Sequence, residues 1–327
     1  PLESSFANVS IAQIDDQTVQ LTLAEPFAPF LSLLTIGILP SHIWSDIAPL
    51  NAPLSELNKK PIGSGPYTFD KLVKDSKGNV RSYTLERFAN FYRGAPYVET
   101  LTFKFYTDLT SAIEALKNKN IEGLSFVPMN EIKELEKDSS ISLTFPYLQQ
   151  YTAAFINLSK DNALSEKSIR NALTLATNKS AIIDVVLEGR GRSIDSFILE
   201  GMIGEHGDLE SVEYDLDAAR IALDEAGWEL VENSIVRQKD EQPLILTLAT
   251  LNTMELVAAA EELKTQWSQA GIDVQINAVD SAIFQTQVLK NLDYDILLSG
   301  ELYGIDPDPY AFWHSSQSEF PGLNVSG

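Results

Sequence analysis

The chain has 327 residues, 44% of them hydrophobic, which is enough to bury a large core and long enough for two lobes. Its 24 Lys and Arg against 46 Asp and Glu leave a net charge of −22, which argues against nucleic acid or anionic lipid as a partner. Cysteine is absent, which excludes a disulfide framework, a thiolate nucleophile and a Cys-ligated zinc site.

The sequence shows neither a membrane-spanning run nor an N-terminal signal peptide. No run of 18 or more apolar residues is present, so the sequence predicts no membrane-spanning helix. The opening residues Pro1–Ser5 do not resemble a signal peptide. Because both ends look like mid-domain sequence, we expect an internal fragment of a longer protein, with any export signal or lipid-anchor cysteine outside these residues.

The first half of the chain is rich in predicted strands. Alternation of apolar and polar residues predicts strands at 18–23, 66–73, 81–87, 101–106 and 142–148. Residues 40–62 are rich in Pro, Ser and Asn and are expected to form a loop or short-helix connector. A polar turn is predicted at 77–79, and a helix over 111–119 with Ile113 and Leu116 on one face.

The second half alternates helices and strands. Helices are predicted over 165–189, 217–227, 254–270 and 283–291, and strands over 244–249, 272–279 and 294–298. Asp217 is the expected N-cap of its helix, and Gly227 the expected left-handed residue at the C-terminal end. The strand-helix-strand run 244–279 is a βαβ unit, so its strands are expected to be parallel with a right-handed crossover.

A glycine-rich run, Pro61-Ile62-Gly63-Ser64-Gly65-Pro66-Tyr67, separates the connector from the next strand. Its two glycines permit a positive φ or the close approach of another backbone, and Pro66 fixes φ where the strand begins. The spacing is not that of a nucleophile elbow, and the Lys-Ser/Thr of a phosphate loop is missing. The run therefore predicts a tight turn that leads into a strand.

Candidate catalytic and metal-binding residues are sparse. His42, His206 and His314 are isolated, and no metal-ligand spacing accompanies them, so we expect structural histidines, no metal and no cofactor. The carboxylates at 131–136 and 261–262 look like solvated helix faces, whereas a glycosidase needs two carboxylates facing across a cleft. The sequence therefore predicts a protein that is not an enzyme.

A series of short motifs resembles, in order and spacing, the extracellular solute-binding family 5, which contains the peptide and oligopeptide receptors of ABC importers. The motifs lie at 16–23, 25–31, 61–67, 85–92, 101–128, 155–158, 168–173, 214–220, 225–228, 270–274, 294–296 and 306–309. Each motif is weak alone, and their order and spacing make the match specific. The resemblance runs across the whole chain.

The resemblance implies an α/β fold with the two-lobe, type II architecture of periplasmic binding proteins, in which mixed sheets are flanked by helices and a hinge joins the lobes. Residues 1–50 are then the end of an accessory subdomain and a connector. Residues 51–148 form part of lobe I, and residues 149–327 form lobe II, incomplete at its C-terminus.

The resemblance also implies a function. The protein is expected to be the substrate-binding component of an ABC importer that captures peptides in an inter-lobe cleft and delivers them to a membrane permease. We expect a monomer that is periplasmic or lipid-anchored to the outer face of the bacterial membrane. Three alternatives stay open: the same fold binding an oligosaccharide or metal chelate, a ligand sensor for a signalling partner, and a hydrolase, although no nucleophile–base constellation supports the last.

In the family the ligand is contacted by two segments, the crossing between lobes near 147–151 and the loop after the strand at 294–298. The implied ligand-binding residues are Tyr147, Gln149, Tyr151, Gly300, Glu301, Tyr303 and Asp306. Among the aromatic residues Tyr147, Tyr151, Tyr303 and Trp313, we favour ligand roles for Tyr147 and Tyr303 and core roles for the other two.

The acidic residues near the end of the chain leave the ligand class open. Peptide receptors of the family hold the peptide's α-ammonium with an Asp four residues before the last Pro of the Asp-Pro pair. That position is Ile305 here, with Asp306 beside it, so a non-peptide oligomer stays an option. Asp306 and Asp308 act as a ligand clamp, in an Asx-type turn, or in both roles together. Glu301 either binds a cationic group in a desolvated cleft or is solvated.

Overall fold

The computed structural model divides into two compact units, Pro1–Leu143 and Thr144–Gly327. It describes residues 6, 8–27, 29–202, 204–205, 209–304, 308–318 and 322–326. The predicted α/β class is confirmed, since both units contain sheets and helices. Among the described residues, no helix has both the length and the apolar composition that crossing a membrane requires. The assignment of 1–50, 51–148 and 149–327 to a subdomain and two lobes stays a prediction.

The first unit begins with an antiparallel hairpin of β1 (Val9–Gln13) and β2 (Val19–Leu23). In its turn, the Asp15 carboxylate accepts a hydrogen bond from the backbone N–H of Gln17 at 2.8 Å. β2 confirms the strand predicted over 18–23, whereas β1 was not predicted. The connector predicted over 40–62 is also confirmed. The connector contains the short helices α3 (Ser41–Trp44), η1 (Pro49–Leu54) and η2 (Glu56–Lys59), and α2 (Phe30–Leu33) lies just before it.

A three-stranded antiparallel sheet follows, in the order β3-β4-β5. Its strands, β3 (Tyr67–Lys74), β4 (Val80–Arg87) and β5 (Thr100–Lys104), confirm three predicted strands. The polar turn between β3 and β4 is held by the Asp75 carboxylate, which accepts from the backbone N–H groups of Lys77 and Asn79 at 2.9 Å each. Gly63 and Gly65 use neither freedom expected of them: their φ angles are not positive, and a Cβ on either would meet no atom within 4 Å.

Two helices complete the first unit, α4 (Leu109–Lys117) and α5 (Met129–Leu135). α4 starts and ends two residues earlier than predicted because Asp108 is its N-cap and accepts from the backbone N–H of Ser111 at 2.8 Å. Ile113 is buried and Leu116 half-buried, as their shared face predicts. α5 was not predicted.

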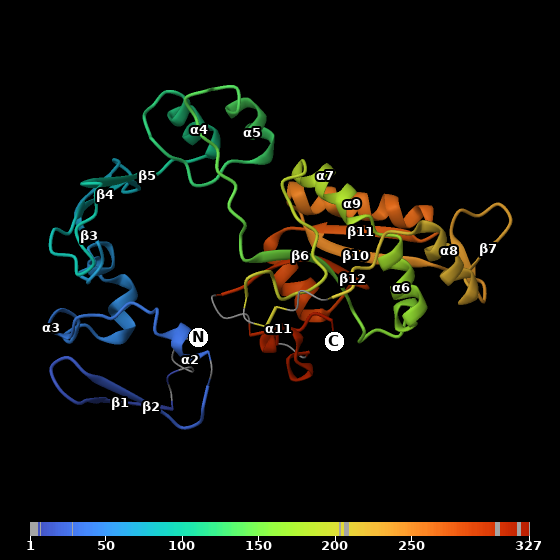
Figure 1. Ribbon diagram of the computed structural model, residues 1–327, viewed down its shortest axis with the longest axis horizontal. Helices are drawn as coiled ribbons and strands as arrows, with labels where there is room; N and C mark the ends of the chain where they lie inside the picture. The colour runs from blue at the N-terminus through green and yellow to red at the C-terminus, as the bar shows by residue number, and fades with distance from the viewer. Residues whose placement is uncertain are drawn as a thin grey trace. The chain divides into compact units, whose positions relative to one another are not determined.

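The second unit is built on a mixed four-stranded sheet in the order β11-β10-β12-β6 (Figure 1). Its strands are β6 (Gln150–Ile156), β10 (Ile245–Leu251), β11 (Asp273–Val279) and β12 (Ile296–Leu302). β10 is parallel to both β11 and β12, which confirms the predicted parallel βαβ pairing. β6 lies antiparallel to β12 at the edge of the sheet. This last pairing places a segment near residue 150 beside one near residue 300.

Helices cover this sheet and bury two apolar clusters, one on each face. Figure 1 shows α7 and α9 running alongside the strands. The helices are α6 (Lys167–Leu175), α7 (Lys179–Leu187), α8 (Leu216–Glu225), α9 (Met254–Gln269), α10 (Ser281–Ile283), the π-helical η4 (Phe284–Leu289) and α11 (Tyr310–Trp313). The larger cluster joins α6, α8 and α9 to the sheet, and includes Ile169, Leu223 and Trp267. The smaller includes Tyr151, Phe284 and Leu297.

Short elements fill the remaining connections of the second unit. They are η3 (Ala163–Ser165), β7 (Glu229–Leu230), β8 (Arg237–Lys239), β9 (Gln242–Pro243) and η5 (Ser315–Gln317). Strands β7, β8 and β9 form a small antiparallel sheet. β8 brings Arg237 to the C-terminal ends of two longer helices, where its guanidinium bonds to backbone carbonyls of Trp228 at 2.6 Å and Ala270 at 2.8 Å.

The strand predicted over 142–148 is wrong. These residues form no regular element, and the strand begins only at Gln150. Two aromatic residues of the segment are instead held by cation–π contacts: the guanidinium of Arg190 lies 5.2 Å from the Phe145 ring centroid and that of Arg192 5.2 Å from the Tyr147 ring centroid. Residues 142–148 have the alternating pattern of a strand, but in the described part of the chain they have no neighbouring strand to pair with. The pairing with β12 begins only with β6.

Three further predicted helices also have wrong boundaries. The helix predicted over 165–189 is two helices, because Asn178 caps α7 by accepting from the backbone N–H of Ala181 at 3.0 Å. The N-cap of α8 is Asp215, which accepts from Ala218 at 2.9 Å, and Asp217 lies in the first turn. Gly227 does take the predicted left-handed conformation, with φ of 82°. The helix predicted over 283–291 starts at Ser281 and becomes π-helical from Phe284.

Candidate ligand-binding site

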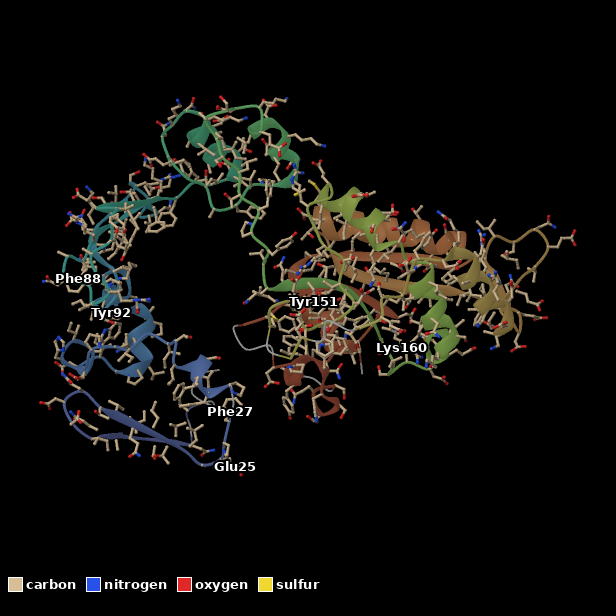
Figure 2. All side chains as sticks on the ribbon, in the orientation of Figure 1. Glu25, Phe27, Phe88, Tyr92, Tyr151 and Lys160 are labelled. Carbon is tan, nitrogen blue, oxygen red and sulfur yellow. The ribbon has the colours of Figure 1, made fainter. Side chains whose placement is uncertain are left out.

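The β6–β12 pairing brings four of the predicted site residues together. The register places Glu301 directly opposite Tyr151, and the backbone N–H of Tyr303 donates to the carbonyl of Gln149 at 2.8 Å. Residues opposite each other in an antiparallel pair present their side chains on the same face. The Tyr151 hydroxyl accordingly donates to Oε2 of Glu301, and the Tyr151 and Tyr303 rings lie 5.6 Å apart. Figure 2 labels Tyr151 on β6.

Glu301 is a buried carboxylate with incomplete hydrogen bonding. It is only 5% exposed, so the solvated alternative for this residue is wrong. Oε2 has the Tyr151 hydroxyl, but Oε1 has no partner among the residues that the structure describes. Burial raises the pKa of the Glu301 carboxyl, and the Tyr151 hydrogen bond opposes that shift. Burial, reinforced by Glu301, also raises the pKa of the Tyr151 phenol far above its usual range.

A cavity of about 550 Å³ within the second unit has Glu301 among its lining residues. Its lining consists of Phe155, Phe284, Gln285, Leu289, Lys290, Leu292, Leu297, Ser299, Gly300, Glu301, Phe312, Ser318, Gly322, Leu323, Asn324 and Val325. The lining is dominated by aromatic and aliphatic side chains from β6, β12, η4 and α11 and from the described residues 292 and 322–325. Glu301 and Lys290 are its only charged residues among those described. Mostly apolar cavities with few polar groups are typical of small-molecule binding sites.

The other predicted site residues have different surroundings. Gly300 lines the cavity next to Glu301. Gln149 is exposed and joins the cluster only through its backbone carbonyl. Tyr147 is 76% exposed, and the Arg192 guanidinium lies over its ring. The described hydrogen bonds and ring contacts do not join Tyr147 to the Tyr151–Glu301 pair. Asp306 lies outside the described residues.

The two aromatic residues with expected ligand roles therefore differ in exposure. Tyr303 is 93% buried within the smaller apolar cluster, where Tyr151 also lies. The Trp313 ring contacts Phe155 at 5.9 Å and stacks on Phe197 at 4.7 Å, but Trp313 is 38% exposed, so it is not the buried core residue that was expected. Asp308 accepts from the backbone N–H of Tyr310 at 3.0 Å, which is the Asx-type turn.

Several cavity residues were missed in the sequence. Phe155 follows Tyr151 by four residues on one strand, so period-2 alternation places both on one face, and this signal was available. Phe284 and Phe312 come from separate helical elements, and only the tertiary fold brings them to the same cavity. No local pattern in the sequence identifies them.

The described part of the chain holds no group of three or more His, Cys, Asp or Glu side chains arranged to bind a metal ion. His314 hydrogen-bonds locally, with Nδ1 2.9 Å from the Ser316 hydroxyl, in keeping with a structural histidine. His206 lies outside the described residues. The cavity lining offers apolar contact surface together with one acidic residue, Glu301, and one basic residue, Lys290.

Three comparisons place the chain among known proteins. The oligopeptide-binding protein AppA of Bacillus subtilis (strain 168) is 30% identical over 305 residues, 90% of this chain and 53% of AppA. The nickel-binding periplasmic protein of Escherichia coli (strain K12) is 25% identical over 323 residues, 96% of this chain and 59% of that protein. The structure of B. subtilis AppA in complex with a nonapeptide has a TM-score of 0.67 at 27% identity, covering 99% of this chain and 64% of that one.

The chain spans about half the length of the curated relatives it matches. A family model described as bacterial extracellular solute-binding proteins, family 5 (middle) matches residues 2–322. The match covers nearly the whole sequence and agrees with the family that the ordered motifs predicted. The chain belongs to the bacterial extracellular solute-binding proteins of family 5.

Proposed function

We propose that this protein is the solute receptor of an ABC importer and that it captures short peptides for delivery to a membrane permease. The observation that carries the proposal is the apolar cavity beside the buried Glu301, in a chain of a solute-binding family. A relative that is 30% identical over 305 residues is an oligopeptide-binding protein. A peptide ligand suits such a cavity because its side chains supply apolar surface to bury and its termini supply charges to pair.

The proposal extends to location and partners. The receptor acts outside the cytoplasmic membrane, in the periplasm or anchored to the outer face, as the extracellular solute-binding family suggests. It works as a monomer with residues 51–148 and 149–327 as parts of its two lobes, and the permease is its protein partner. It binds its solute without chemical turnover.

A second candidate is a receptor for a metal chelate. The observation that favours it is the similarity to the E. coli nickel-binding periplasmic protein, over 96% of this chain. A chelate brings its own metal ligands, so the receptor needs only contact surface and a few polar groups. The two candidates share one mechanism and differ in solute.

The deciding experiment identifies the natural solute. The protein is purified gently and denatured, and the released small molecules are analysed by mass spectrometry, followed by calorimetric titration with what is found. A ladder of short peptides that rebind with about micromolar or tighter affinity supports peptide capture. A metal chelate moves the solute class to the second candidate. If no small molecule is released and neither a peptide library nor a set of chelates binds, the receptor proposal fails.

A further inference from the structure

The negative charge of this protein is concentrated in the second unit. Residues 144–327 contain 29 Asp and Glu against 11 Lys and Arg, a net charge of −18, whereas residues 1–143 contain 17 against 13, a net charge of −4. The cavity lies in the acidic unit. A field of one sign around a cavity with low-dielectric walls attracts ligands of the opposite charge and raises their association rate.

Among the residues that line the cavity, Glu301 has the same sign and an oxygen without a hydrogen-bond partner. Glu301 is 95% buried and its Oε1 has no hydrogen-bond partner among the described residues, although the strand register holds the carboxylate in place through Tyr151. A buried charge without a partner is costly, so a ligand cation that pairs with Oε1 relieves that cost as it binds. The other charged lining residue, Lys290, already takes part in an interaction of its own.

The rest of the lining selects what carries the cation. Phe155, Phe284 and Leu297 line the cavity together with aliphatic residues of the neighbouring elements. An alkyl stem buries its methylene groups against such a surface at a gain of roughly 0.8 kcal/mol per CH₂ in general. Lysine and arginine side chains combine a stem of this kind with a terminal cation.

We propose that this cavity binds the side chain of a lysine or arginine within a short peptide, with the stem against Phe155 and Phe284 and the terminal cation on Oε1 of Glu301. The inference rests on the proposed function and narrows its substrate class to basic peptides. It assigns the selectivity to Glu301, independently of whatever group holds the peptide's α-ammonium.

The test compares matched peptides on matched proteins. Calorimetry measures the affinity of Ala-Lys-Ala and of Ala-norleucine-Ala, which keeps the alkyl stem and lacks the cation, for the unmodified protein, for Glu301→Gln and for Asp293→Asn. Glutamine keeps an oxygen for the Tyr151 hydroxyl but removes the charge. Asp293 has a side chain that is 85% exposed and does not line the cavity, so its replacement controls for the loss of one negative charge.

We expect Ala-Lys-Ala to bind the unmodified protein about ten- to a hundredfold more tightly than the norleucine peptide, which is the range for a charge-assisted hydrogen bond. Glu301→Gln removes that preference and leaves norleucine-peptide binding intact, which also shows that the variant is folded. Asp293→Asn keeps the preference. N-acetylated Ala-Lys-Ala retains the dependence on Glu301, because the side chain and not the α-ammonium is the partner.

Two outcomes overturn the inference while leaving the receptor role standing. In the first, both peptides bind equally and Glu301→Gln changes neither affinity. In the second, the effect of Glu301→Gln vanishes once the α-amine is acetylated, which moves the contact to the peptide's N-terminus. Failure of every peptide to bind any of the three proteins counts instead against the proposed function itself.

Discussion

At the scale of single residues, Glu301 is where stability and binding oppose each other. Its carboxyl is buried on a strand, and one hydroxyl, that of Tyr151, bonds to it. A residue placed for packing alone would be apolar here, because an ion with one partner is poorly compensated for lost hydration. The missing hydrogen-bond partner of Oε1 also favours binding of a ligand that supplies one. This is the physical basis of the cation site proposed above.

The pH dependence of stability tests this reasoning without a ligand. The pKa of Glu301 is raised in the folded protein by burial, so the folded state binds this proton more tightly than the unfolded state. Stability from this group is therefore present below the ordinary glutamate pKa and is lost as the pH rises through the raised folded value. We expect Glu301→Gln to lack this loss and to be more stable than the unmodified protein at neutral pH.

Thermal or urea unfolding of both proteins across pH 4–8, a range of about four units that brackets the ordinary glutamate pKa, supplies the measurement. As the pH rises, the free energy of unfolding of Glu301→Gln is expected to increase relative to that of the unmodified protein. A glutamine variant that is less stable at every pH would show that the carboxylate is fully compensated in the folded state.

At the scale of elements, helix ends explain much of what holds the second unit together. Arg237 is 3% exposed, and its guanidinium bonds to the carbonyls of Trp228 and Ala270, just beyond the ends of α8 and α9, and to Asp224. The last carbonyls of a helix have no partner within the helix, and a cation there also complements the helix dipole. One buried arginine thus bonds to the C-cap carbonyl of α9, to a carbonyl in the segment after α8 and to the Asp224 side chain.

We expect Arg237→Met to lower the free energy of unfolding by about 2–3 kcal/mol, the range for lost hydrogen bonds to a charged group. Arg220→Met is the matched control. Arg220 also bonds to a carbonyl at the end of α9, that of Gln269, but its side chain is 44% exposed, so the expected cost is below about 1 kcal/mol. Urea unfolding followed by tryptophan fluorescence measures both; equal costs would argue that burial of Arg237 is unimportant.

The elements also show why local patterns predicted some boundaries and missed others. Strong caps and stops act within a few residues, so Gly227 was recognised. Where two candidate residues stand close together, as Asp215 and Asp217 do, the pattern alone does not choose between them. The segment 142–148 alternates like a strand, yet a strand also needs a partner with free backbone groups. β12 pairs with residues 150–156 and not with residues 142–148.

At the scale of the whole molecule, charge is the property with a direct kinetic consequence. The second unit carries −18 of the total −22. Many exposed carboxylates contribute little to the stability of the fold individually. Their summed field, however, extends over a distance of about 10 Å at 0.1 M salt and acts on any charged solute that approaches.

We therefore expect the association rate of a cationic tripeptide to fall about tenfold between roughly 20 mM and 300 mM salt, in the range reported for electrostatic steering. The norleucine peptide serves as the comparison, and its association rate should stay nearly constant. Stopped-flow fluorescence, using the tryptophans of the second unit, provides the rates. If the association rates of both peptides fell equally with salt, the cause would be a salt effect on the conformation of the protein and not attraction of the cationic peptide.

The sequence by itself determined the family, the α/β class, most strands and helices, and the absence of cysteine chemistry. These properties depend on composition, on short-range periodicity and on the order of motifs along the chain. The family resemblance also implied Tyr151, Gly300 and Glu301 as ligand-binding residues, which stays a prediction. The sequence did not reveal that Tyr151 and Glu301 are bonded partners, or that Phe155, Phe284 and Phe312 line a cavity beside them. Only the tertiary structure decided this, because strand pairing and burial bring together residues some 150 positions apart, and no local pattern records such a contact.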